Sequence, residues 1–210
     1  MANESGSQYA KVETVLRGTA TDNDITKVLS LVSGIIPEER QLGSFREHVR
    51  AYSHTKRSIR VFNSIPVTNT SPPYLIKYLG EPDRRVAMPC IKRTIIDAYT
   101  SADPSNLLTL TNATFQFEYV RSGYRYVTTD GLDVDIYQVY KMPVRGDTSK
   151  VEKLAVDDED MTDDLQSDSY WIVEVRGVTD GKSEGSDISK SLERFIKLLS
   201  PLVIPQSHSG

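Results

Sequence analysis

The chain of 210 residues has little of the chemistry that builds disulfide, redox or zinc sites. Cys90 is its only cysteine, and three histidines accompany it. One cysteine excludes an intramolecular disulfide, and one thiol with three imidazoles is too little for a cysteine–histidine zinc site. Because Cys90 has no activating neighbour except Lys92 and Arg93, we interpret it as a buried structural thiol in a reducing compartment.

Long hydrophobic runs and phosphate-binding glycine motifs are also missing. Nowhere do the roughly 18 apolar residues that a membrane helix needs follow one another, and no GxGxxG or P-loop pattern occurs. A net charge of -4 supplies no overall field that attracts polyanions, which disfavours charge-driven binding of nucleic acid. These absences predict a soluble protein of the cytoplasm or nucleus, with no membrane association, no sequence-specific nucleic-acid binding, no cofactor and no metal.

What the sequence does contain is a series of short alternating apolar runs that predict strands. Residues 11–17 form the first, and the period of two returns in FREHVRAYS, SIRVFNS, PPYLIKYLG and residues 91–99. After Phe115, Phe117 and Tyr119, a Ser-Gly turn within VRSGYRYV and an Asp-Gly turn at residues 130–131 predict a three-strand meander. SYWIVEVRGV is the last clear strand.

Three helices are expected among these strands. Residues 25–35 place apolar side chains on one helical face, and a short helix is predicted after Asp103 and Pro104. The last helix begins near residue 186, and its apolar stripe consists of Ile188, Leu192, Phe195, Ile196 and Leu199. The sequence therefore predicts a β-dominated α+β fold, a many-stranded and mostly antiparallel β-barrel with about three flanking helices.

The domain organisation follows from where apolar residues are scarce. Residues 9–205 are expected to form a single β-barrel domain, with disordered tails at residues 1–8 and 206–210. Residues 148–168 contain a cluster of seven acidic side chains and few apolar ones. Such a segment has little to bury, so we predict a mobile acidic loop.

One set of charged residues suggests an enzyme. Asp133 and Asp135 project from one face of a strand, as do Glu174 and Arg176 from another, and together they could line a tunnel for a metal and polyphosphate. The same alternation is typical of a solvent-facing strand, and the Glu-x-Glu-x-Lys strand of tunnel phosphatases is absent. A triphosphate-tunnel-like phosphohydrolase therefore stays an alternative, and a small-ligand-binding β-barrel with a closed apolar cavity is another.

Two basic clusters are candidates for a charged patch. They consist of Lys56, Arg57 and Arg60, and of Arg84, Arg85, Lys92 and Arg93. Interleaved aromatic residues would suit nucleic acid, but the acidic total charge makes an acidic protein partner at least as good an interpretation.

Aromatic and apolar surfaces supply the candidate partner-binding residues. The chain has 11 tyrosines against 5 phenylalanines, and tyrosine provides rigid amphipathic area at interfaces. Tyr124 and Tyr126 mark either a partner surface or ordinary sheet packing. Leu192, Phe195 and Leu199 either line a groove with residues 25–32 that captures a partner helix or simply cover the barrel.

Five phrases in a particular order resemble the family of Mediator subunit 18. They are YAKVETVLRGTATDNDITKVLSLVSGI, PYLIKYLGEPDRR, VDIYQVYKM, YWIVEVRGV and FIKLLSPLVIP, and they span Tyr9 to Pro205. Mediator is the coactivator complex that links transcription regulators to RNA polymerase II. The relatively short loops suggest a yeast-like member.

The resemblance implies a non-catalytic, protein-interaction scaffold in the Mediator head module, located in the nucleus and supporting transcription. It implies a β-barrel that pairs with Mediator subunit 20 and is tethered by the C-terminal helix of Mediator subunit 8. Other head-module subunits and, indirectly, RNA polymerase II would be further partners. The family has no catalytic residues to transfer onto this sequence.

Overall fold

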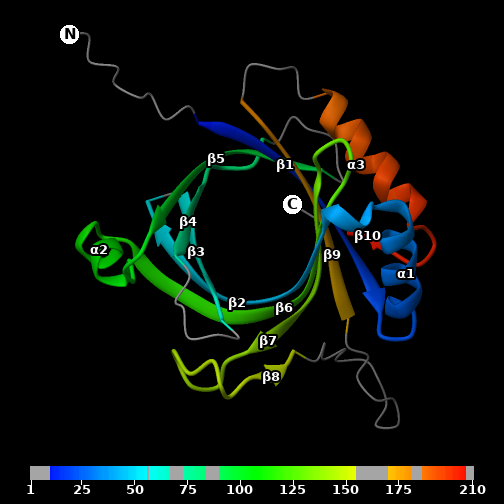
Figure 1. The fold of residues 1–210 in the computed structure, drawn as a ribbon. Coiled ribbons are helices and arrows are strands. Elements are labelled where there is room, and N and C mark those ends of the chain that lie inside the picture. The colour runs from blue at the N-terminus through cyan, green and yellow to red at the C-terminus, as the bar shows by residue number, and fades with distance from the viewer. Residues whose placement is uncertain are drawn as a thin grey trace, which may run out of the picture.

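Eight antiparallel strands close into a barrel (Figure 1) in the computed structural model, which describes residues 10–55, 57–66, 73–83, 90–154, 170–180 and 186–206. The barrel strands are β1 (Lys11–Thr21), β2 (Gln41–His54), β3 (Arg57–Ser64), β4 (Tyr74–Leu79), β5 (Ile91–Thr100), β6 (Thr114–Val127), β7 (Asp133–Lys141) and β9 (Tyr170–Thr179). Their order is β1-β5-β4-β3-β2-β6-β7-β9, and β9 pairs with β1 to complete the ring. The predicted β-dominated α+β barrel is confirmed.

Short strands and helices surround this barrel. They are β8 (Glu152–Lys153), β10 (Ile204–Pro205), α1 (Ile25–Ile35), α2 (Ser105–Leu110), α3 (Ser186–Leu198) and a 3-10 helix (Glu38–Arg40). In Figure 1, α1 and α3 lie together outside β1 and β9, whereas α2 lies on the opposite side of the barrel. No helix in the described ranges is long and apolar enough to cross a membrane.

The main apolar core lies outside the barrel, between its wall and the two long helices. Alternate residues of β1, β7 and β9 face the helices, and most of these residues are apolar. The buried contributors from the wall are Leu16, Ala20, Val134, Ile136, Val173 and Val175, and those from the helices and the segments that follow them include Val28, Val32, Leu192, Phe195, Leu199 and Val203. The stripe predicted in the last helix therefore covers the barrel. Cys90 is also buried in this core, as predicted.

A smaller core lies beneath α2. Leu108 of the helix and Ala113 behind it pack against Tyr52, Ile59 and Val61 on the outer face of β2 and β3. A helix of six residues is only marginally stable alone. Packing of these apolar residues holds α2 on the barrel.

The predicted three-strand meander is wrong. The Ser-Gly pair at residues 122–123 is no turn, because β6 continues through it and pairs with both β2 and β7. Gly123 instead lets β7 approach β6 closely, because a Cβ at this position would overlap the carbonyl oxygen of Ile136. The Asp-Gly pair does form the next turn, where Gly131 has a φ of +82°.

Part of the predicted domain organisation lies outside the described residues. This applies to residues 1–8, to residues 155–168 of the acidic segment and to residues 207–210. The first part of that segment contains β8, which pairs with β7 at Tyr140 and Lys141. The mobility of the acidic segment stays a prediction.

Candidate functional site: the charged interior of the barrel

The inner face of the barrel is charged. Strand residues that alternate with the apolar core positions point inward, and they surround a cavity of about 500 Å³. Seven cationic side chains and three glutamates line it: Arg17, Arg60, Lys77, Arg93, Arg121, Lys141 and Arg176, with Glu13, Glu118 and Glu174. The apolar-outside, charged-inside arrangement reverses the usual division of a small barrel, whose interior side chains fill a core.

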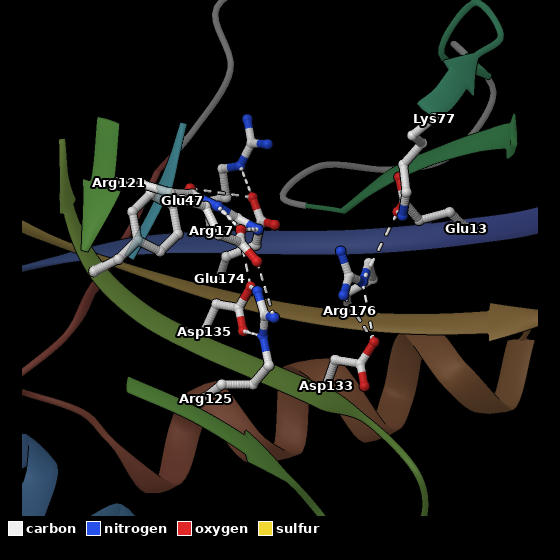
Figure 2. Close-up of polar contacts among 11 residues, drawn as sticks. Glu13, Arg17, Glu47, Lys77, Arg121, Arg125, Asp133, Asp135, Glu174 and Arg176 are labelled. Atoms are coloured by element: carbon white, nitrogen blue, oxygen red, sulfur yellow. Dashed lines mark hydrogen bonds and ion pairs between the residues drawn. The ribbon is translucent and has the colours of Figure 1, made fainter. Parts of the chain in front are cut away.

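The three carboxylates that the sequence singled out lie on the two neighbouring strands β7 and β9. Asp135 of β7 lies directly opposite Glu174 of β9, and Asp133 lies opposite Arg176. Each carboxylate is bound by arginine, however (Figure 2). Arg17 Nε donates to Glu174 at 2.7 Å, Arg176 donates to Asp133 at 2.8 Å, and Arg125 donates to Asp135 at 2.7 Å.

Two further glutamates, which the sequence reasoning missed, complete the network. Glu13 accepts hydrogen bonds from Arg93 at 2.9 Å and from Lys77 at 3.2 Å. Glu47 accepts from Arg121 at 2.8 Å and from Arg125 at 3.2 Å. The available signal was alternation of charge along the first strand, where Glu13 and Arg17 fall on the same face.

Pairing keeps the buried carboxylates ionised. Burial alone would raise the pKa of Glu174, but the guanidinium groups of Arg17, Arg176 and Arg121 lower it to about 2. Burial also raises the pKa of Glu13 and of Glu47, but nearby cations outweigh it. Lys77 and Arg93 lower the pKa of Glu13, and Arg121 and Arg125 lower the pKa of Glu47. At neutral pH the interior is therefore a network of full charges.

This network determines which chemistry the interior suits. A divalent metal needs several carboxylate oxygens that are free to converge on it. Here arginines separate the carboxylates, and the described residues contain no group of three His, Cys, Asp or Glu side chains that could hold a metal. The cavity also differs from the closed apolar cavity expected of a small-ligand-binding barrel, because charged side chains line it.

The predicted partner-binding residues occupy different surroundings. Tyr124 and Tyr126 lie within β6, which is continuous where the sequence predicted a hairpin turn. Tyr124 is 38% exposed, and Tyr126 is buried in the core beneath the helices. Leu192, Phe195 and Leu199 are buried in that same core. A role for these five residues in partner binding stays a prediction.

The two basic clusters do not form one patch. Arg60 and Arg93 point into the barrel, whereas Arg57 lies on the outer face with its guanidinium 5.6 Å from the ring centre of Tyr78. Lys56, Arg84 and Arg85 lie outside the described residues. Arginines that the sequence suggested for a surface patch therefore lie partly inside the barrel.

The sequence and the fold both have recognisable relatives. The family model described as Med18 protein matches residues 12–204. The chain belongs to the Med18 family. The resemblance found in the sequence is thus confirmed over nearly the whole length of this Med18 protein. No curated protein matches the sequence.

Solved structures with the same fold come from several sources. A chain in the Schizosaccharomyces pombe Mediator head module is 16% identical, with a TM-score of 0.69 over 94% of this chain and 98% of that one. PH1819 protein from Pyrococcus horikoshii OT3 is 15% identical, with a TM-score of 0.60 over 94% of both chains. The triphosphatase of the Mimivirus capping enzyme is 11% identical, with a TM-score of 0.56 over 92% of this chain and 90% of that one. Identities this low show the fold alone.

Proposed function

We propose that this Med18 protein is a non-catalytic subunit of the Mediator head module, where it acts in the nucleus as a protein-interaction scaffold for RNA polymerase II transcription. The family match over residues 12–204 carries the proposal. The likeness to a chain of the S. pombe Mediator head module, which extends over 98% of that chain, supports it. A closed barrel suits a scaffold, because closure leaves few free strand edges while the outer surface remains available.

We further propose that Mediator subunit 20 and the C-terminal helix of Mediator subunit 8 are the direct partners. The layer of α1 and α3 offers exposed apolar side chains at its margin: Leu31 is 36% exposed, Ile35 41% and Leu198 53%. A helix could bind there by extending the apolar core outward, as helices bind in grooves. Leu192, Phe195 and Leu199 would then support the site from beneath.

Co-expression of the full chain with both partners, followed by size-exclusion chromatography with mass determination, tests this proposal. We expect one stoichiometric ternary complex. Leu198→Lys should weaken the complex without changing the melting temperature of the free chain, because its side chain is exposed. Leu110→Lys is the matched control, since Leu110 is 81% exposed on α2 at the opposite side of the barrel. A chain that remains monomeric with both partners would contradict the proposal.

A metal-dependent tunnel phosphohydrolase is the second candidate, favoured by the position of Asp133, Asp135 and Glu174 on the neighbouring strands β7 and β9. The arginines bound to each carboxylate argue against it, because they occupy the oxygens that a metal would need. An assay for metal-dependent phosphate release from tripolyphosphate decides between the two. Activity that disappears in Glu174→Gln would favour the enzyme.

A further inference from the structure

Positive charge exceeds negative charge around the cavity inside the barrel. Seven of its lining residues are arginine or lysine, and three are glutamate. All three glutamates already have partners: Glu13 binds Lys77 and Arg93, Glu174 binds Arg17, and Glu118 binds His48 and the backbone amide of Gly146. Glu47, Asp133 and Asp135, which belong to the same network, are paired with Arg121 and Arg176. The carboxylates of the network therefore have little capacity left to neutralise further cations.

Arg60 is a lining cation for which this network supplies no carboxylate, as is Lys141. It lies half-buried on the inner face of β3, and its guanidinium stacks 5.0 Å from the ring centre of Phe117. Among the residues that the structure describes, no carboxylate pairs with it. Burial and the nearby charges of Arg93 and Arg17 lower the pKa of its guanidinium. Even partial burial of a charge without a counter-charge is costly, so an anion at this position would be bound favourably.

Arg17 and Arg93 add hydrogen-bond donors beside Arg60. Arg17 uses Nε for Glu174, and its two terminal nitrogens donate no hydrogen bond to the described residues. Arg93 binds a single oxygen of Glu13 through Nε and one terminal nitrogen. Guanidinium groups match phosphate oxygens in a two-pronged geometry. The three side chains come from β1, β3 and β5, so a ligand with several phosphates can meet more of them than a single phosphate can.

We propose that the barrel interior binds a small linear polyphosphate, free or as the triphosphate of a nucleotide, through Arg17, Arg60 and Arg93, without metal and without hydrolysing it. The cavity of about 500 Å³ has the size of a small-molecule site. This binding goes beyond the proposed scaffold function and does not depend on it. The acidic net charge of the whole chain is no obstacle, because the fold concentrates cations in one enclosed place.

Isothermal titration calorimetry of the full chain, at fixed ionic strength and with EDTA present, tests the proposal. Inorganic tripolyphosphate should bind with one site per chain. Orthophosphate should bind at least about tenfold more weakly, because it makes fewer charge-assisted contacts. Equal affinity for ATP would show that the phosphate chain is recognised from either source. Binding of tripolyphosphate but not of ATP would assign the site to free polyphosphate. No saturable binding of either would overturn the proposal.

Substitution of two arginines on β3 distinguishes binding inside the barrel from general electrostatic attraction to the surface. Arg60→Gln should weaken tripolyphosphate binding about tenfold or more, by loss of a charge-assisted contact, whereas Arg57→Gln on the outer face should leave it unchanged. Equal weakening by both variants would overturn the proposal. Because the charge of Arg60 has no described carboxylate partner, Arg60→Gln without ligand should melt no lower than the wild-type chain. Arg60→Lys is a second variant, which keeps the positive charge but loses the two-pronged hydrogen bonding of the guanidinium. It should bind tripolyphosphate with intermediate affinity. Assembly with the proposed Mediator partners should be unaffected in all of them.

Discussion

At the scale of single residues, the unusual feature of this Med18 protein is that ionised side chains line the space where a small barrel normally has an apolar core. Glu13, Asp135 and Glu174 are each less than a tenth exposed, and each is bound by arginine or lysine. Burying a carboxylate in this way is tolerable only while its partners remain, because an unpaired buried charge costs several kcal/mol. Single substitutions inside the barrel should therefore be more costly than charge substitutions on its outer surface.

Glu174 provides the test of this expectation. At neutral pH, Glu174→Gln should lower the free energy of unfolding by about 3 kcal/mol, since Arg17 loses its buried partner. The pKa of Glu174 is about 2 in the folded chain, below its ordinary value of 4.5. Its stabilising contribution is therefore full above pH 4.5 and is lost as the pH falls toward 2. The difference in stability between the wild-type chain and the variant should narrow over that range.

Urea unfolding at a series of pH values measures this difference. Glu152→Gln is the control, because Glu152 is exposed on β8 and its loss should change the stability by less than about 0.5 kcal/mol. A difference for Glu174→Gln that stays constant as the pH falls below 4.5 would show that the ion pair with Arg17 does not stabilise the fold.

At the scale of elements, the conformation of β6 follows from packing rather than from its local sequence. A Ser-Gly pair between two alternating runs is a good turn signal, but Gly123 lies in a continuous strand paired on both sides. Its missing side chain lets β7 approach. Glycine at this position indicated either a turn or the close approach of another strand. Only the position of β7 shows that it is close approach.

Gly123→Ala and Gly34→Ala should therefore have opposite effects. A Cβ at Gly123 would overlap the Ile136 carbonyl and the Tyr137 backbone, so we expect a loss of about 1–3 kcal/mol or more from overpacking. Gly34 lies in α1 with nothing within 4 Å of an added Cβ, so alanine there should stabilise the chain by up to about 1 kcal/mol. Chemical denaturation of the two variants measures both values, and equal effects would refute the role assigned to Gly123.

At the scale of the whole molecule, the helix layer and the barrel wall share one core. Leu192 of α3 is fully buried in this core, together with Val28 and Val32 of α1 and Val173 of β9. The strands cannot bury their outer apolar faces without the helices, and the helices have no other surface to cover. The two layers should thus unfold together.

Two leucines of α3 test the shared core. Leu192→Ala should cost about 2–5 kcal/mol, as for other buried leucines, and should leave a single cooperative unfolding transition. Leu198→Ala, at a position 53% exposed, should change the stability by less than about 0.5 kcal/mol. Calorimetry measures both. A small effect at Leu192, or a separate transition for the helix layer, would contradict a common core.

The sequence by itself determined the local structure and the family. Alternation of period two identified most of the strands, the apolar stripes identified α1 and α3, and the ordered phrases identified the Med18 family. Asp133, Asp135 and Glu174 were also recognised as residues that share faces of neighbouring strands.

Only the tertiary structure decided which face of each strand is the interior. A period of two distinguishes two faces, but it does not say which one a barrel encloses and which one the helices cover. The partners of the buried charges depend on register between strands far apart in the chain, as for Glu13 with Lys77 and Glu47 with Arg121. Because these pairs form only when strands distant in the chain come together, local sequence could not show that arginines bind the carboxylates or that Arg60 faces the cavity.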